Sequence, residues 1–311
     1  MYPVETRKNY LVLTPDGVGS TYLQRALTVY LQFAELDYWN THELLNGLAV
    51  EDGSLYKDST HEYTQTVEDI CNKLLITGNF LVSRIAHYHV LGRQKLREEN
   101  YADLYKECNR KFSTIIFCAR DPFEYALSWG IRKNSGKLNV YSVAERIETH
   151  GVGVKEPIDL DHFQSKLDQY AEYEYWAEDN FTIKHTVNYD HLHRNVDSVL
   201  QSITGMQHTT FLQQYSRLRY LASKNQYTGE LLDDICEMHN MIDRLHRTKR
   251  LPTTMPLKMN TMANKRSRVT NFDQAVETYN NWALKGNRHA IVTEEIISNK
   301  IDTEKQIYAD R

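Results

Sequence analysis

The sequence predicts an α/β protein, a three-layer sandwich with a mostly parallel central sheet. Short apolar runs at residues 10–13 and 114–118 are typical of strands buried in a parallel sheet. A turn and then a predicted helix follow each run, the first helix over residues 22–33 and the second from Pro122. Strands that alternate with helices favour helices on both faces of one sheet.

Hydrophobic spacing and turn residues define the remaining elements. In chain order we expect a turn-rich segment at 40–59, a helix at 62–75, a second strand around 75–82, a charged helix at 94–111, mostly helix from 131 to 180, a strand running into one helix from 182 to about 203, a helix at 230–247 and a loop at 251–268. A last amphipathic helix begins after Asn271, which, like Thr270, is a residue that caps helices.

The segment at 114–130, TIIFCARDPFEYALSWG, is the most informative in the chain. Its apolar run ends at Arg120, which therefore lies at the carboxyl end of a strand, where open α/β sheets bind ligands. Pro122 suits the first turn of a helix, and Ser128, eight residues after Arg120, can point back to it two turns on. A guanidinium and a hydroxyl that converge can clamp a phosphate. The same pattern is also typical of an ordinary strand–turn–helix unit with a surface arginine.

The second informative segment is the loop TPDGVGST at residues 14–21, between the first strand and its helix. Gly17 and Gly19 can adopt positive φ and let the main chain approach an anion closely. Ser20 and Thr21 can cap the helix and donate hydroxyls, while the helix start offers N–H groups to the anion. The loop is not a Walker A motif, because it has no Gly-Lys-Ser/Thr. A capped helix after a strand accounts for the same residues.

In this order, about a hundred residues apart, the two segments resemble the nucleotide-binding motifs of the sulfotransferases. The resemblance implies a P-loop NTPase-like fold of sulfotransferase type, with 3′-phosphoadenosine 5′-phosphosulfate (PAPS) as co-substrate. It implies that Arg120 and Ser128 hold the 3′-phosphate. The loop residues that it assigns to the 5′-phosphosulfate are Gly17, Gly19, Ser20 and Thr21.

The chain departs from the family at two positions. Asp121 replaces the usual Asn, and residues 16–18, Asp-Gly-Val, replace the segment with the family's Lys or Arg. That basic residue stabilises the charge that develops during sulfuryl transfer. Arg84 is our first candidate for the missing cation, and Arg25 is the second.

Further candidates for the site are two histidines and a basic run. The family places a basic group just after the second strand, where this chain has His87, our first choice for a general base, and His89, our second. Histidine titrates near neutrality, although the chain has 13 of them and a packed or surface histidine is the plain alternative. Near the C-terminus, Lys265 and Arg266 match a basic family loop that contacts the 3′-phosphate, or they form a solvated loop.

Composition limits the class of protein. With 311 residues and 41% hydrophobic content, we expect one domain over residues 1–311, with helical insertions at about 134–180 and 206–250. A net charge of −4 does not favour nucleic acid as a partner. Four cysteines without metal-ligand spacing predict no metal site and a reduced, cytoplasmic location. No run of about eighteen apolar residues occurs, so no membrane anchor is expected.

The chain has 21 tyrosines, several of them in the predicted helix around residues 170–176. We interpret these as amphipathic helix packing with solvated hydroxyls, and a stacking surface for bases is the alternative.

The expected function is transfer of a sulfuryl group from PAPS to a hydroxyl or amine of a small-molecule or carbohydrate acceptor, by in-line displacement. An inactive descendant that binds a nucleotide or partner is the alternative, motivated by the missing basic residue and Asp16. A small-molecule kinase is a third reading, disfavoured by the absent Walker lysine. The sequence predicts no particular oligomeric state.

Overall fold

The computed structural model describes residues 9–15, 17–33, 38–40, 80–86, 98–134, 155–206, 261–286 and 288–309. The chain divides into two compact units. The sheet unit comprises Met1–Ala119 and Glu172–Phe211, and the helical unit comprises Arg120–Ala171 and Leu212–Arg311. The single domain with two helical insertions stays a prediction. The helices expected at 62–75 and 230–247 lie outside the described residues.

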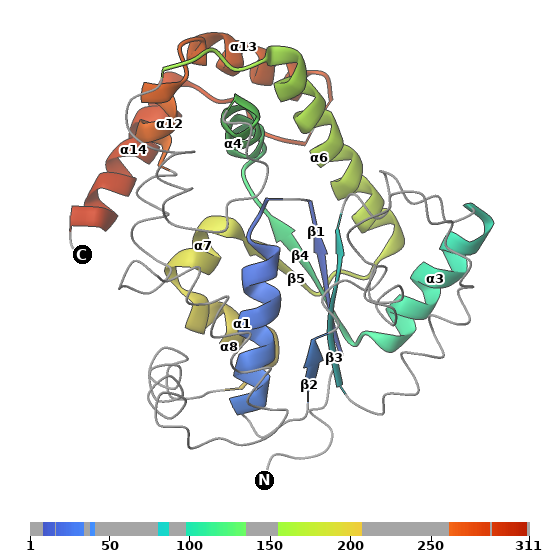
Figure 1. The fold of residues 1–311 in the computed structure, drawn as a ribbon. Coiled ribbons are helices and arrows are strands. Elements are labelled where there is room, and N and C mark those ends of the chain that lie inside the picture. Colours follow the sequence, from blue (N-terminus) through green and yellow to red (C-terminus); the bar gives the residue numbers. More distant parts are fainter. Residues whose placement is uncertain are drawn as a thin grey trace. The chain divides into compact units, whose positions relative to one another are not determined.

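Within its described residues, the sheet unit contains five parallel strands in the order β2-β3-β1-β4-β5 (Figure 1). Their bounds are β1 Tyr10–Thr14, β2 Tyr38–Asn40, β3 Phe80–Ala86, β4 Thr114–Ala119 and β5 His185–Asn188. Leu13 of β1 pairs in register with Ile85 of β3 and with Phe117 of β4. Because β3 and β4 lie on opposite sides of β1, the strand order reverses there, and open α/β sheets bind ligands at such a point. The predicted α/β class with a parallel sheet is confirmed.

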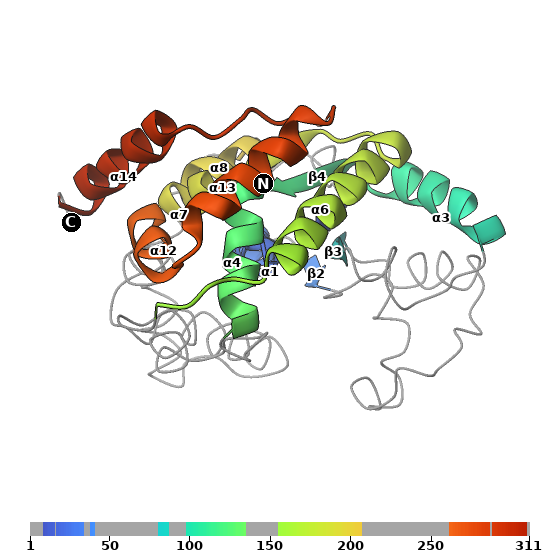
Figure 2. The ribbon, with the colours of Figure 1, turned by 90° about the horizontal axis from the view of Figure 1, so that it is seen from above.

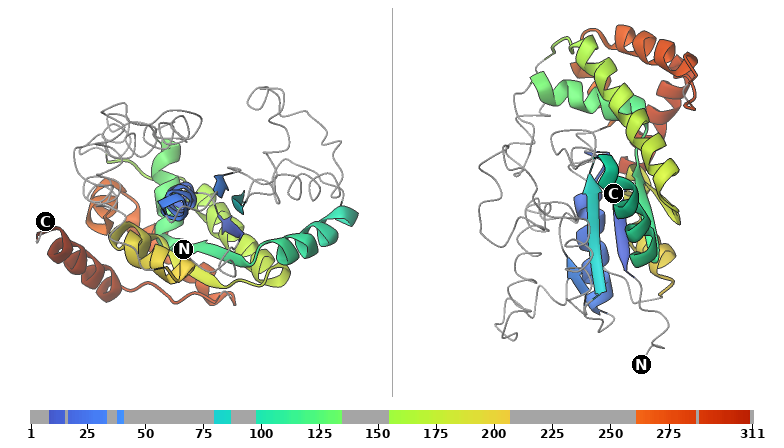
Figure 3. Two further views of the ribbon diagram at one scale, coloured as in Figure 1. Left: turned by 90° about the horizontal axis from the view of Figure 1, so that it is seen from below. Right: turned by 90° about the vertical axis from the view of Figure 1, so that its right-hand side faces the viewer.

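Helices cover both faces of this sheet, as the right-hand view of Figure 3 shows. On one face, α3 (Glu98–Lys111) and the C-terminal half of α6 (Leu160–Asn180) pack on the strands through one apolar cluster. Its buried members include Leu11, Leu13, Ile85, Ile115, Phe117, Tyr105, Cys108, Tyr173 and Ala177. Alternate residues such as Tyr10 and Val12 point to the other face, where α1 (Ser20–Phe33) packs on β1, β2 and β3.

After β5 the chain forms two helices, α7 (Tyr189–Arg194) and α8 (Val196–Thr204), where the sequence predicted one. The break lies at Asn195, whose φ of −137° and ψ of 51° are not helical. Gly205 ends α8 in the left-handed region at φ 72°, a conformation that suits glycine. Asn188 caps α7, because its side chain accepts a hydrogen bond from the N–H of Asp190 at 2.9 Å.

The helical unit is built around α4 (Pro122–Asn134), which contacts α12 (Met262–Arg268) and α13 (Phe272–Leu284) (Figure 2). Helix α14 (Glu294–Ala309) packs on α12. The buried ring of Phe123 meets the rings of Phe163, Phe272 and Tyr279 edge-on, with centroids 5.3–6.0 Å apart. This aromatic cluster holds the first turn of α4 in place.

Three expectations near the C-terminus are wrong. Residues 262–268 form helix α12 and not a loop, because Thr261 caps it by accepting from the N–H of Asn264 at 3.3 Å. Asn271 precedes α13 but does not cap it with its side chain, which instead bonds the N–H and the C=O of Ile158, each at 2.9 Å. The helix after Asn271 is also not the last, since α14 follows it.

Asn188→Ala is expected to lower the free energy of unfolding by about 1 kcal/mol, because the cap hydrogen bonds are lost. Asn195 is a matched control, since it precedes α8 but makes no side-chain cap bond. Asn195→Ala should therefore change stability by less than about 0.5 kcal/mol. Urea unfolding of both variants measures the difference, and equal losses would contradict the assignment of the cap.

Candidate functional site

The turn between β4 and α4 is formed by two residues, Arg120 and Asp121. Asp121 caps α4, because its Oδ1 accepts from the N–H of Glu124 at 2.9 Å. Pro122 is the first residue of α4, as predicted, where its missing N–H costs nothing. Asp and Asn are both good N-cap residues, so an aspartate at this position suits the start of α4.

The two side chains predicted to clamp a phosphate do converge. Nη2 of Arg120 donates to Oγ of Ser128 at 3.1 Å. Both residues are buried, with 6% of Arg120 and 3% of Ser128 exposed. The spacing of eight residues produces this contact because Ser128 lies two turns into α4. A buried arginine with a hydroxyl beside it interacts strongly with an anion, since little water screens the charge.

The glycine loop also has the predicted main-chain conformation. Gly17 and Gly19 have φ of 79° and 78°, a region that other residues rarely adopt. Helix α1 begins at Ser20, and the C=O of Gly19 accepts its first bond from Leu23 at 3.0 Å. Asp16 and the side chains of Thr21 and Arg25 lie outside the described residues, so their predicted roles stay predictions.

Arg84, the first candidate for the missing cation, lies beside this loop. It is on β3 and buried, and its Nη1 donates to Oγ of Ser20 at 3.4 Å. The contact joins two residues that the sequence assigned to the same phosphosulfate site from separate motifs. It is long for a hydrogen bond and therefore weak.

Cys118 lies close enough to Arg84 for the guanidinium to influence its thiol, but this thiol is not a reactive one. It is completely buried in β4, and burial raises the pKa of its thiol to about 12, although Arg84 opposes the shift. A protonated thiol is a poor nucleophile, so the chemistry of this site does not pass through Cys118.

Neither histidine candidate can be placed. His87 and His89 lie outside the described residues, one and three positions beyond the end of β3 at Ala86. The role of His87 as general base stays a prediction.

The basic run near the C-terminus belongs to a helix and faces carboxylates. Nζ of Lys265 bonds Oε2 of Glu124 at 2.7 Å, and both side chains are buried. Nη1 of Arg266 pairs with Oε1 of Glu294 at the surface. The pattern Lys-Arg-Ser-Arg left open a loop that contacts a phosphate and a solvated loop, and both cationic heads contact carboxylates of the protein.

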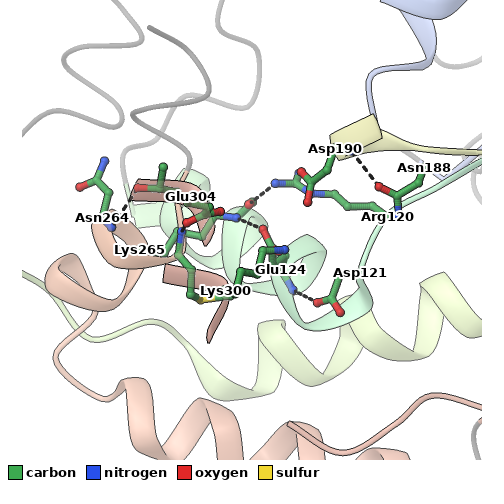
Figure 4. A network of polar contacts seen from close by, with 12 residues as sticks. Arg120, Asp121, Glu124, Asn188, Asp190, Asn264, Lys265, Lys300 and Glu304 are labelled. Atoms are coloured by element: carbon green, nitrogen blue, oxygen red, sulfur yellow. Dashed lines mark hydrogen bonds and ion pairs between the residues drawn. The ribbon is translucent and has the colours of Figure 1, made fainter. Parts of the chain in front are cut away.

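Figure 4 shows that Lys265 belongs to a network that joins α4, α12 and α14. Lys300 pairs with the second oxygen of Glu124, and Glu304 accepts from the N–H of Met262 at 2.8 Å. Burial lowers the pKa of Lys300, while Asp121 and Glu304 oppose the shift. Sequence reasoning missed this network because Glu124, three residues after the cap Asp121, resembles the ordinary last member of a capping box.

Two further properties concern the described residues alone. No group of three His, Cys, Asp or Glu among them could hold a metal ion. Within those same ranges, no helix has both the length and the apolar character needed to cross a membrane.

The fold places the chain in the class of α/β proteins with an all-parallel sheet. No family model matches the sequence, and no curated protein and no solved structure matches it. The function must therefore be inferred from the residues of the chain itself.

Lys265→Ala is expected to lower the free energy of unfolding by about 3–5 kcal/mol, the usual result when one partner of a buried ion pair is removed. Arg266→Ala is the matched control. Its neighbouring pair with Glu294 is exposed, and its loss should cost less than about 1 kcal/mol. Chemical unfolding of both variants measures the difference. Equal and small losses would show that Lys265 is not buried against Glu124.

Proposed function

We propose that the chain is a PAPS-dependent sulfotransferase-like enzyme that transfers a sulfuryl group to a hydroxyl or amine acceptor. The observation that carries the proposal is the contact between Arg120 and Ser128 at 3.1 Å, directly after a central strand. The sequence motif that resembles the sulfotransferase 3′-phosphate clamp required these two side chains to converge. An ordinary strand–turn–helix unit with a surface arginine does not require a buried guanidinium.

The proposal has two anion-binding groups. Arg120 and Ser128 take the 3′-phosphate. Gly17, Gly19, Ser20 and Thr21 take the 5′-phosphosulfate, and the positive φ of both glycines supports this role. No metal is part of the proposed site.

Arg84 provides the charge that the glycine loop lacks. Sulfuryl transfer spreads negative charge over the sulfuryl oxygens, so a fixed cation stabilises the transition state more than the ground state. The 3.4 Å contact with Ser20 supports a place for Arg84 among the groups that face those oxygens. His87, one residue beyond β3, is the proposed base for the acceptor.

Lys265 and Arg266 are not among the residues that we propose to bind the nucleotide. Their heads contact Glu124 and Glu294, so nucleotide binding would first have to break an ion pair. For Lys265 that pair is buried and the cost is high.

A binding protein without turnover is the second candidate. It is favoured by residues 16–18, which carry a carboxylate and no cation where the family has a basic residue. Such a protein would bind the nucleotide through Arg120 and Ser128 but would not lower the barrier for transfer. Incubation with PAPS and a panel of phenol, alcohol and amine acceptors separates the two candidates, because only the enzyme releases adenosine 3′,5′-bisphosphate faster than buffer does.

Arg120→Ala is expected to weaken binding of adenosine 3′,5′-bisphosphate, the product nucleotide, by about 10- to 100-fold, since a charge-assisted contact is lost. Calorimetric titration of the whole chain measures the change. Arg110→Ala is the matched control, because Arg110 forms an exposed pair with Glu107 on α3 and the variant makes the same change in net charge. Its affinity should equal that of the wild type. Absence of binding to the wild type would overturn the proposed function.

A further inference from the structure

Two tyrosines on α6, Tyr170 and Tyr173, make contacts that the proposed function has not used. Both are buried, with 1% and 0% of their surface exposed, so the expectation of solvated hydroxyls is wrong for them. Each hydroxyl bonds two main-chain groups at the carboxyl ends of strands. These strand ends are the places where the two proposed anion-binding groups begin.

Tyr170 bonds both main-chain polar groups of Arg120. Its hydroxyl donates to the C=O of Arg120 at 2.8 Å and accepts from the N–H of Arg120 at 3.0 Å. Arg120 follows the last residue of β4, so hydrogen bonds between strands no longer satisfy its main-chain N–H and C=O. The ring of Tyr170 is held by Tyr125 and His289, with centroids 5.0 and 6.1 Å away. A rigid side chain therefore fixes the main chain that carries the guanidinium.

Tyr173 makes the equivalent contacts in the sheet unit. Its hydroxyl donates to the C=O of Ile85 at 2.7 Å and accepts from the N–H of Thr14 at 3.0 Å. Thr14 is the last residue of β1, where the glycine loop begins, and Ile85 follows Arg84. The ring of Tyr173 stacks on Phe117 with centroids 6.3 Å apart. The hydroxyl of Tyr173 therefore holds both the start of the glycine loop and the main chain next to Arg84.

A tyrosine hydroxyl suits these places because it donates and accepts at once. A buried N–H or C=O without a partner is unfavourable, and phenylalanine could satisfy neither group. Water could also serve, but a side chain on a packed helix allows less movement. Small displacements of a binding group matter, because a charge-assisted hydrogen bond weakens steeply with distance and angle.

We propose that Tyr170 and Tyr173 are positioning residues, each for one end of the nucleotide. Tyr170 aligns Arg120 with the 3′-phosphate, and Tyr173 aligns the glycine loop and Arg84 with the 5′-phosphate. This inference rests on the proposed function, and it adds that specificity for the 3′-phosphate depends on a hydroxyl that does not touch the nucleotide.

The experiment compares two probes on the whole chain by calorimetry, adenosine 3′,5′-bisphosphate and adenosine 5′-monophosphate, which lacks the 3′-phosphate. Tyr170→Phe should weaken binding of the bisphosphate by about tenfold and leave binding of the monophosphate unchanged. The ratio of the two affinities therefore falls. Tyr173→Phe should weaken both by a similar factor and preserve the preference. General loosening of the fold would weaken both probes in Tyr170→Phe as well, so the ratio of affinities in that variant separates positioning from stability.

The inference and the proposed function can fail separately. The inference alone is wrong under one combination of results. In that combination the wild type prefers the bisphosphate, Arg120→Ala abolishes this preference, and Tyr170→Phe keeps it. If the wild type binds neither probe, the proposed function fails and the inference with it. Calorimetry reports the binding-competent fraction separately from the affinity, so partial unfolding of a variant does not change the ratio.

Hydrogen exchange at the Arg120 amide of the wild type keeps the inference testable if Tyr170→Phe does not fold. The amide should exchange slowly without nucleotide, because Tyr170 already holds it. Fast exchange that slows only when adenosine 3′,5′-bisphosphate is added would show that the ligand, and not Tyr170, orders Arg120, and would overturn the inference.

Discussion

The main-chain polar groups at the carboxyl ends of the parallel strands impose the main constraint on this structure. Where a buried ladder stops, each N–H and C=O needs another partner. At Thr14 and Ile85 that partner is the hydroxyl of Tyr173, and at Arg120 it is the hydroxyl of Tyr170. The side chain of Thr14 adds a bond to the C=O of Pro15 at 2.7 Å. Satisfying these groups also fixes the starting direction of each segment that the proposed function uses.

The local parts of this arrangement could be predicted from the sequence. The strand at 114–119, the turn at Asp121-Pro122 and the contact between Arg120 and Ser128 depend on residues within a few turns of one another, so apolar runs and helical spacing suffice. The same holds for the positive φ of Gly17 and Gly19. Pattern reasoning works here because each residue is placed by its neighbours in the chain.

The rest could not be predicted because its partners are distant in sequence. Lys265 lies 141 residues from Glu124, and without that carboxylate a basic run looks like a solvated loop. The side chain of Asn271 bonds Ile158, 113 residues away, and so leaves the capping role that its position suggested. Tyr170 illustrates the same limit, because a tyrosine that bonds a main chain cannot be told by pattern from one whose hydroxyl meets solvent.

The buried charges around Glu124 bear directly on the proposed phosphate clamp. Glu124 lies one turn before Ser128 on α4, and a carboxylate in that first turn would compete with a phosphate for nearby cations. Its two oxygens face Lys265 and Lys300, and Asp121 is engaged in capping α4. Attraction between these groups is strong in a buried setting, so the carboxylate stays with its lysines. Helices α12 and α14, remote from the clamp in sequence, thus hold the carboxylate of Glu124 in place one turn before Ser128.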